Sequence, residues 1–80
     1  MYTVYLLKSE IAVKSYVGMT NDLERRIIEH NAGKHLYTKR HAPWQVVYVE
    51  KCDNLKTARA REKYQKSAAG RKFLKKKVFS

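Results

Sequence analysis

The run from Trp44 to Glu50 constrains the fold most, because it is the clearest β-strand in the sequence. It is rich in aromatic and β-branched residues, which favour extended backbone. Alternation of side chains gives this strand two faces, one with Trp44, Val46 and Tyr48 and the other with Val47 and Val49. We interpret Trp44 as a core residue. A strand of this kind needs partners in a sheet.

The N-terminal third supplies two candidate partner strands. Residues 2–7 are rich in β-branched and aromatic side chains, and residues 15–18 repeat that character. The polar connection over residues 8–14 is longer than a tight two-residue turn. We therefore predict two antiparallel strands joined by an extended loop.

A helix is predicted over residues 22–32. Asn21 can cap its start, Glu24 stands at the capping-box position, and Gly33 suits a left-handed helix stop. On a helical wheel one sector holds Leu23, Arg26, Ile27 and His30, whereas Arg25 points the other way. Because a buried unpaired charge is costly, an arginine beside an apolar stripe needs a partner.

A second helix is predicted over residues 55–67, capped by Asp53 or Asn54. Its inward face combines Leu55, Ala58, Glu62 and Ala69. Gly70 is expected to interrupt it, and residues 71–77 to form a short basic helix or a fraying end. The resulting order is strand, strand, helix, strand, helix, helix. The predicted fold class is α/β (α+β), a three-stranded antiparallel sheet flanked by helices, with residues 1–80 forming one domain.

Composition narrows the class of partner. Lys and Arg number 18 against 7 Asp and Glu, a formal net charge of +11. Such an excess favours a polyanion, with nucleic acid ahead of an acidic membrane surface and an acidic protein. Hydrophobic residues at 44% exclude a disordered basic tail.

The remaining counts exclude several other classes. The single cysteine, Cys52, can form neither an intrachain disulfide nor a thiolate zinc site, and we interpret it as a semi-buried small residue. No apolar run approaches the roughly 18 residues of a membrane span, and no secretory signal is recognisable. The expected compartment is the cytoplasm, without membrane association.

Periodicity places a set of polar side chains inward or beside apolar faces: Tyr5, Tyr16, Arg26, His30 and Glu62. Phosphodiester cleavage needs such groups, to take a proton from water, to neutralise charge on the phosphate and to hold a divalent metal. A structural reading stays open for each. The tyrosines can be buried rings with satisfied hydroxyls, Arg26 and Glu62 an ion pair between helices, and His30 a protonated histidine near a helix C-terminus.

Residues 34–43 are expected to form a basic loop. This loop and the segment from Arg71 to Lys77 can bracket a phosphate backbone, while Tyr37 or His41 stacks on a base. The candidate nucleic-acid-binding residues are Lys34, Tyr37, Thr38, Lys39, Arg40 and Arg71. The alternative is a solvated loop and tail that only aid solubility.

Several blocks of the sequence together resemble a known family. Thr3-Val4-Tyr5 is followed by Tyr16-Val17-Gly18, then by the segment from Asn21 to His30 and by downstream blocks at residues 37–39, 43–50 and 60–66. In this order and spacing they resemble the GIY-YIG nuclease domain, in its small single-domain branch related to the N-terminal domain of the excinuclease C subunit. The resemblance covers nearly the whole chain.

The resemblance implies a role for each position that matches the family's motifs. Tyr5 would be the general base, which requires Arg26 and a metal to favour its anionic form, and Tyr16 would orient the water. Arg26 would contact the scissile phosphate, Glu62 would hold Mg²⁺ or Mn²⁺, and His30 would assist. The implied activity is metal-dependent hydrolysis of DNA, and a role in DNA repair is a hypothesis.

The sequence also departs from the family pattern. The glycine and isoleucine of the first motif are replaced by Thr3 and Val4, and no clear asparagine follows Glu62. Larger members carry a separate DNA-targeting domain, so weak sequence specificity or structure selectivity is expected here. Branched DNA, single-stranded DNA and RNA stay open as partners, as do a monomer and a homodimer. The alternatives are a non-catalytic DNA- or RNA-binding module, and a nuclease active only within a larger complex.

Overall fold

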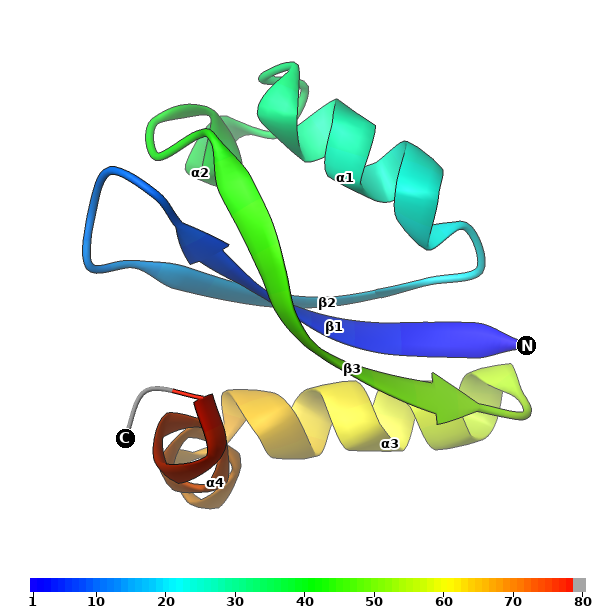
Figure 1. The fold of residues 1–80 in the computed structure, drawn as a ribbon. Coiled ribbons are helices and arrows are strands. Elements are labelled where there is room, and N and C mark those ends of the chain that lie inside the picture. Colours follow the sequence, from blue (N-terminus) through cyan, green and yellow to red (C-terminus); the bar gives the residue numbers. More distant parts are fainter. Residues whose placement is uncertain (79–80) are drawn as a thin grey trace.

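A computed structural model describes residues 1–78. The chain forms a three-stranded antiparallel sheet with helices on both faces (Figure 1). The elements in order are β1 (Tyr2–Ser9), β2 (Ser15–Thr20), α1 (Leu23–Asn31), α2 (Leu36–Lys39), β3 (Trp44–Cys52), α3 (Leu55–Lys66) and α4 (Ala68–Val78). The strand order is β2-β1-β3, so β1 is central. No helix among the described residues is long and apolar enough to cross a membrane.

The sheet separates two hydrophobic clusters. Figure 1 shows α1 and α2 over one face and α3 and α4 over the other. Tyr5, Leu7 and Trp44 form the cluster with α1, against Leu23 and Ile27. On the opposite face, Val4 and Cys52 pack against Ala58 of α3. Alternation along β1 therefore sends Tyr5 toward α1 and its neighbour Val4 toward α3. Trp44 is confirmed as a core residue, and Cys52 is more deeply buried than the semi-buried position that we predicted.

The predicted loop over residues 34–43 contains a helical turn, α2, that the sequence did not reveal. This turn spans four residues and has no side-chain cap, so neither periodicity nor a capping motif marks it. A tertiary contact holds it instead, since the Trp44 indole Nε1–H donates to the Thr38 carbonyl at 2.7 Å. The observed order is thus β-β-α-α-β-α-α.

The ends of α1 and α3 agree with the predictions to within one residue, whereas α4 begins at Ala68 and not at the predicted Arg71. The cap of α1 is Asp22 rather than Asn21, because its carboxylate accepts from the Arg25 backbone N–H. Asn54 caps α3 in the same way. Gly33 follows α1 with φ of 79°, the left-handed conformation expected at a helix stop.

Gly70 lies inside α4 and does not interrupt a helix. The break comes earlier, at Ser67, whose extended backbone separates α3 from α4. A Cβ at Gly70 would collide with the backbone carbonyl oxygen of Tyr64, so the glycine lets α4 cross closely over the end of α3. Ala69 consequently belongs to α4, where it is exposed, and does not share the face of Ala58.

The predicted faces of β3 are wrong beyond its midpoint. Leu6 of β1 pairs with Tyr48, but the next residue, Leu7, pairs with Val46, so a β-bulge adds one residue to β3. The bulge reverses the alternation. Trp44 and Val46 face α1, whereas Tyr48 turns to the opposite face and meets the Phe73 ring of α4 at a centroid distance of 6.1 Å.

Candidate active site

Tyr5 lies at the centre of the sheet, across from a glycine on the neighbouring strand. It is 2% exposed, and Gly18 of β2 is its partner in the β1–β2 register. A Cβ on Gly18 would collide with the Tyr5 hydroxyl. The glycine therefore leaves the space in which the phenol lies across β2.

His30 brings the last turn of α1 onto this phenol. Its imidazole is fully buried, and Nε2 lies 3.0 Å from the Tyr5 hydroxyl oxygen. The other ring nitrogen, Nδ1, lies 2.9 Å from the Thr38 hydroxyl of α2. Because the Thr38 hydroxyl donates to the His35 carbonyl at 3.4 Å, it accepts from Nδ1–H. Nε2 is then the acceptor for the Tyr5 O–H.

The surroundings keep His30 neutral. Burial, with smaller effects from His35 and Arg26, lowers the pKa of His30 from its ordinary value of 6.5 to about 4. A neutral imidazole has a free lone pair on Nε2, as the hydrogen bond with Tyr5 requires. The alternative of a protonated histidine stabilised by the helix C-terminus does not describe this site.

Burial also has the largest effect on the pKa of Tyr5. It raises the pKa of the phenol, and the neighbouring Tyr16 raises it further, whereas the Arg26 charge lowers it. Arg26 thus acts in the expected direction, but burial outweighs it. Arg26 by itself therefore does not bring the pKa of Tyr5 below its ordinary value. We expected Arg26 and a metal together to favour the anionic form, and the contribution of the metal stays a prediction.

Tyr16 and two further aromatic residues surround the Tyr5–His30 pair. The Tyr16 ring lies 6.4 Å from the Tyr5 ring and 5.0 Å from the His30 ring between centroids. The His35 ring lies 4.6 Å from the His30 ring and is tilted against it by 39°, and the Tyr37 ring lies 6.0 Å from the Tyr16 ring. Tyr16 is partly exposed, so it forms the boundary between the buried pair and solvent.

Arg26 lies on the inward side of α1, as the helical wheel predicts. Its side chain is 35% exposed, compared with 67% for Arg25. The Arg26 guanidinium contacts Glu29 at 3.8 Å and His35 Nε2 at 3.5 Å. Its ion-pair partner is therefore on its own helix, and the interpretation as a structural pair with Glu62 is wrong. A partly exposed guanidinium with one distant carboxylate partner is available to a phosphate.

Glu62 comes from α3, on the other face of the sheet. Its carboxylate pairs with Lys66 at 3.4 Å and is 25% exposed. Its charge contributes to raising the pKa of Tyr5, which indicates that the two groups lie within electrostatic range. Within residues 1–78, no cluster of three or more His, Cys, Asp or Glu side chains could hold a metal ion. A single partly exposed carboxylate still fits Mg²⁺, which commonly uses one or two protein carboxylates with waters and substrate phosphates.

Comparison with known proteins identifies the family of this domain. A family model described as the GIY-YIG catalytic domain matches residues 1–77. The chain belongs to the GIY-YIG catalytic domain family. GIY-YIG domains are nuclease domains that act on DNA and generally use divalent metal ions. The sheet flanked by helices agrees with the fold of this family.

Small GIY-YIG proteins named UPF0213 are among the relatives. The chain is 42% identical to a UPF0213 protein of Clostridium perfringens over 82% of this chain and 71% of that protein. It is 38% identical to one of Staphylococcus saprophyticus over 90% and 88%, and 45% identical to one of Haloquadratum walsbyi over 65% and 60%. No solved structure gives a significant match.

Within this GIY-YIG domain, the predicted nucleic-acid-binding residues separate into two groups. Tyr37 and Arg71 line one groove, although they come from α2 and α4. Lys34, Lys39 and Arg40 are exposed on and beside α2. Thr38 belongs to neither group, because it is fully buried and its hydroxyl contacts His30. Its side chain therefore offers no accessible surface to a phosphate backbone.

From the sequence, one polar residue of this site was assigned a different role and another was missed. Thr38 was predicted to bind nucleic acid, and its contact with His30 was not foreseen, since the α2 turn itself is not recognisable in the sequence. Gln65 of α3 is fully buried, and its Nε2 donates to Glu50 at 2.8 Å. Gln65 is seven residues after Ala58 and three after Glu62, so extending the α3 wheel would have placed it inward.

Proposed function

We propose that this GIY-YIG protein is a metal-dependent endonuclease that hydrolyses DNA phosphodiester bonds with weak sequence specificity or structure selectivity. The observation that carries the proposal is the hydrogen bond from the Tyr5 hydroxyl to His30 Nε2. It connects a phenol to a neutral imidazole whose far nitrogen is held by Thr38. Such a chain lets Tyr5 accept a proton from water while passing its own proton to His30.

In the proposed reaction a water oxygen attacks phosphorus, and the phosphorus–oxygen bond of the leaving group breaks. The water proton moves to the Tyr5 oxygen as the phenol proton moves to His30 Nε2. Arg26 stabilises the added charge on the phosphate, and the leaving oxygen takes a proton from solvent. Tyr16, the more exposed of the two tyrosines, orients the water. Glu62 would hold Mg²⁺ or Mn²⁺, which supplies positive charge beside the phosphate oxygens.

In this proposal a tyrosine with a raised pKa serves as a base without forming a phenolate. Burial disfavours the phenolate, because it raises the pKa of Tyr5. Transfer of the phenol proton to His30 avoids the phenolate, because the phenol never carries a full negative charge when the two protons move together. The imidazolium that forms is only a transient species, and the low pKa of His30 returns the proton to solvent after cleavage.

A second function, a DNA- or RNA-binding module without cleavage, is favoured by one specific observation. Tyr5 is 2% exposed, which leaves little room for water at its hydroxyl. In this alternative the Tyr5–His30 bond is a buried structural contact, and the basic surface alone carries the function.

The decisive experiment incubates the purified protein with plasmid, branched and single-stranded DNA, in Mg²⁺, in Mn²⁺ and in EDTA. Nicking that needs metal and disappears in Arg26→Ala and Glu62→Ala supports the nuclease. Arg25→Ala is the matched control, because it removes the same charge one residue away on the exposed side of α1. Salt-sensitive binding without cleavage, unchanged in Glu62→Ala, would establish the binding module instead.

A further inference from the structure

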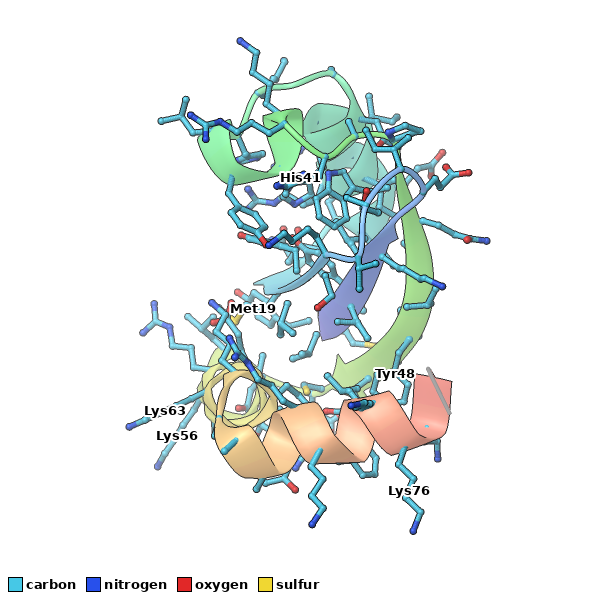
Figure 2. All side chains as sticks on the ribbon, turned by 90° about the vertical axis from the view of Figure 1, so that its left-hand side faces the viewer. Met19, His41, Tyr48, Lys56, Lys63 and Lys76 are labelled. Atoms are coloured by element: carbon cyan, nitrogen blue, oxygen red, sulfur yellow. The ribbon has the colours of Figure 1, made fainter. Side chains whose placement is uncertain are left out.

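A groove of about 830 Å³ lies between the β1–β2 connection and the junction of α3 with α4. Figure 2 faces this end of the molecule, with the hairpin above and α4 across the bottom. Tyr16 and Tyr37 line the groove at one side, and Lys66, the partner of Glu62, also lines it. The groove therefore meets the candidate active site at Tyr16 and near Glu62.

The groove wall is both basic and apolar. Its cations are Lys8, Lys14, Lys66, Arg71 and Lys75, and none of the described residues that line it is acidic. Between them, Leu6, Val17 and Leu74 contribute an aliphatic surface, and Tyr16 and Tyr37 contribute rings 6.0 Å apart. Cations beside an apolar floor match a ligand that carries both phosphate and a flat hydrophobic ring.

One buried polar atom in the groove wall lacks a partner. Gln65 is fully buried, and its amide nitrogen donates to the Glu50 carboxylate, which can only accept. This bond fixes the orientation of the amide and leaves Gln65 Oε1 without a hydrogen-bond donor. A buried unsatisfied acceptor costs free energy, which a ligand N–H or O–H would recover.

We propose that this groove binds a nucleotide of a single-stranded DNA segment, unstacked from its neighbours and next to the phosphate that is cleaved. The cations bind the backbone phosphates, the base lies against the apolar floor and the tyrosines, and an N–H of that base donates to Gln65 Oε1. A base in a duplex is stacked and paired, so it presents neither a free face nor a free Watson–Crick edge. The selectivity of the protein is accordingly for unpaired strands.

The proposal rests on the proposed function only for the position of the cleaved phosphate, and binding is measurable without cleavage. Fluorescence anisotropy in EDTA compares a labelled single-stranded oligonucleotide with the same sequence as a blunt duplex and with the corresponding RNA. The single DNA strand is expected to bind about tenfold more tightly than the duplex, the effect of one stacked base. Equal affinity for strand and duplex would overturn the proposal, and tighter binding of RNA would transfer the site to RNA.

Two double variants that remove the same charge test whether the DNA strand binds in this groove. Lys14→Ala/Lys75→Ala removes two groove cations, whereas Lys56→Ala/Lys63→Ala removes two cations of α3 whose side chains point away from the molecule (Figure 2). The groove variant should lower the slope of log affinity against log salt by about 1.4, since each phosphate contact on a single strand contributes about 0.7. An equal decrease of this slope in the two double variants would contradict the placement of the DNA strand in the groove.

Gln65→Met tests the acceptor at nearly constant side-chain volume. Loss of one hydrogen bond should weaken single-strand binding about fivefold, with little change in duplex binding. Unchanged single-strand binding by a folded Gln65→Met protein would overturn the role of Gln65. If this variant does not fold, the lysine variants still decide the proposal. Single-strand binding without cleavage would contradict the proposed nuclease but would leave the groove proposal intact. Nicking of duplex DNA, with equal affinity for single strand and duplex, would support the nuclease and contradict the groove proposal.

Discussion

The Tyr5 hydroxyl and His30 Nε2 form a buried hydrogen bond of 3.0 Å between the central strand and the last turn of α1. Tyr5→Phe removes the hydroxyl and keeps the ring. If Tyr5 is the base, cleavage should fall by about 10²–10⁴-fold, the usual contribution of general base catalysis. DNA affinity should stay unchanged. The measurement is single-turnover cleavage beside anisotropy, and equal cleavage by Tyr5→Phe would eliminate the phenol from the reaction.

Tyr2→Phe is the control for that experiment, since it removes a hydroxyl from the same strand on the opposite face of the sheet.

Tyr5→Phe also leaves His30 Nε2 buried without a donor. Its free energy of unfolding should therefore fall by about 1–3 kcal/mol. Urea unfolding followed by circular dichroism measures this loss, which Tyr2→Phe should not show.

Thr38 is expected to act through His30. Thr38→Val keeps the side-chain shape and removes the acceptor for Nδ1–H, so the imidazole loses its fixed tautomer and orientation. We expect kcat to fall by about tenfold, with KM for DNA unchanged. Thr38→Ser, which restores the hydroxyl, should recover most of the activity. A rise in KM without a change in kcat would instead mean that Thr38 contacts DNA.

The stability of the protein should depend on pH through His30. Its pKa falls from 6.5 to about 4 on folding, so between these values the unfolded chain binds more protons than the folded one. The stabilisation is fully present above pH 6.5 and is lost as the pH falls toward 4. Urea unfolding from pH 7.5 to 4 should show this loss in the wild type, and His30→Gln should show a smaller slope. Equal slopes would mean that His30 titrates normally.

Gly18→Ala should disturb the site without removing any polar group. The added Cβ would collide with the Tyr5 hydroxyl and displace the phenol from His30. We expect a loss of stability of about 1–3 kcal/mol, as for other overpacked sites, together with loss of cleavage by the folded protein.

Gly33→Ala is the control for this experiment, because it strains the backbone without displacing the Tyr5 side chain. Gly33 has a positive φ, and the nearest atom to an added Cβ is the flexible Lys39 side chain at 3.4 Å. The backbone strain should cost about 1–2 kcal/mol, but cleavage by the folded protein should persist. Loss of cleavage in both variants would show that activity follows stability and not the placement of Tyr5.

A separate prediction concerns the contact between β3 and α3. Arg61 donates two hydrogen bonds of 2.8 Å to Glu50, and they are the main reason that the pKa of this carboxyl is lowered. Arg61→Met should reduce stability by about 1.5–3 kcal/mol, the usual value for charge-assisted hydrogen bonds. Lys56→Met, on the exposed side of the same helix, should stay near the wild type. A stable Arg61→Met protein would show that Tyr48 and Gln65 suffice for Glu50.

Periodicity predicted the parts of the molecule that depend on local sequence. The α1 wheel distinguished Arg26 from Arg25, and Gly33 marked the end of the helix, because a helix fixes both relationships within a few residues. Tyr48 was assigned to the wrong face, since a bulge arises from pairing between strands and not from the sequence of one strand. The contact of Thr38 with His30 was equally hidden, because it depends on a turn that the Trp44 indole holds in place.

The position of Tyr5 on the central strand links activity to the global stability of the fold. β1 is hydrogen-bonded to a strand on each side, so its amides should exchange with solvent only when the whole domain unfolds. We consequently expect no partly open state in which the candidate base is displaced while the rest of the protein stays folded. Heat should abolish activity and structure in one cooperative step, and a variant that raises the melting temperature should extend the range of activity by the same number of degrees.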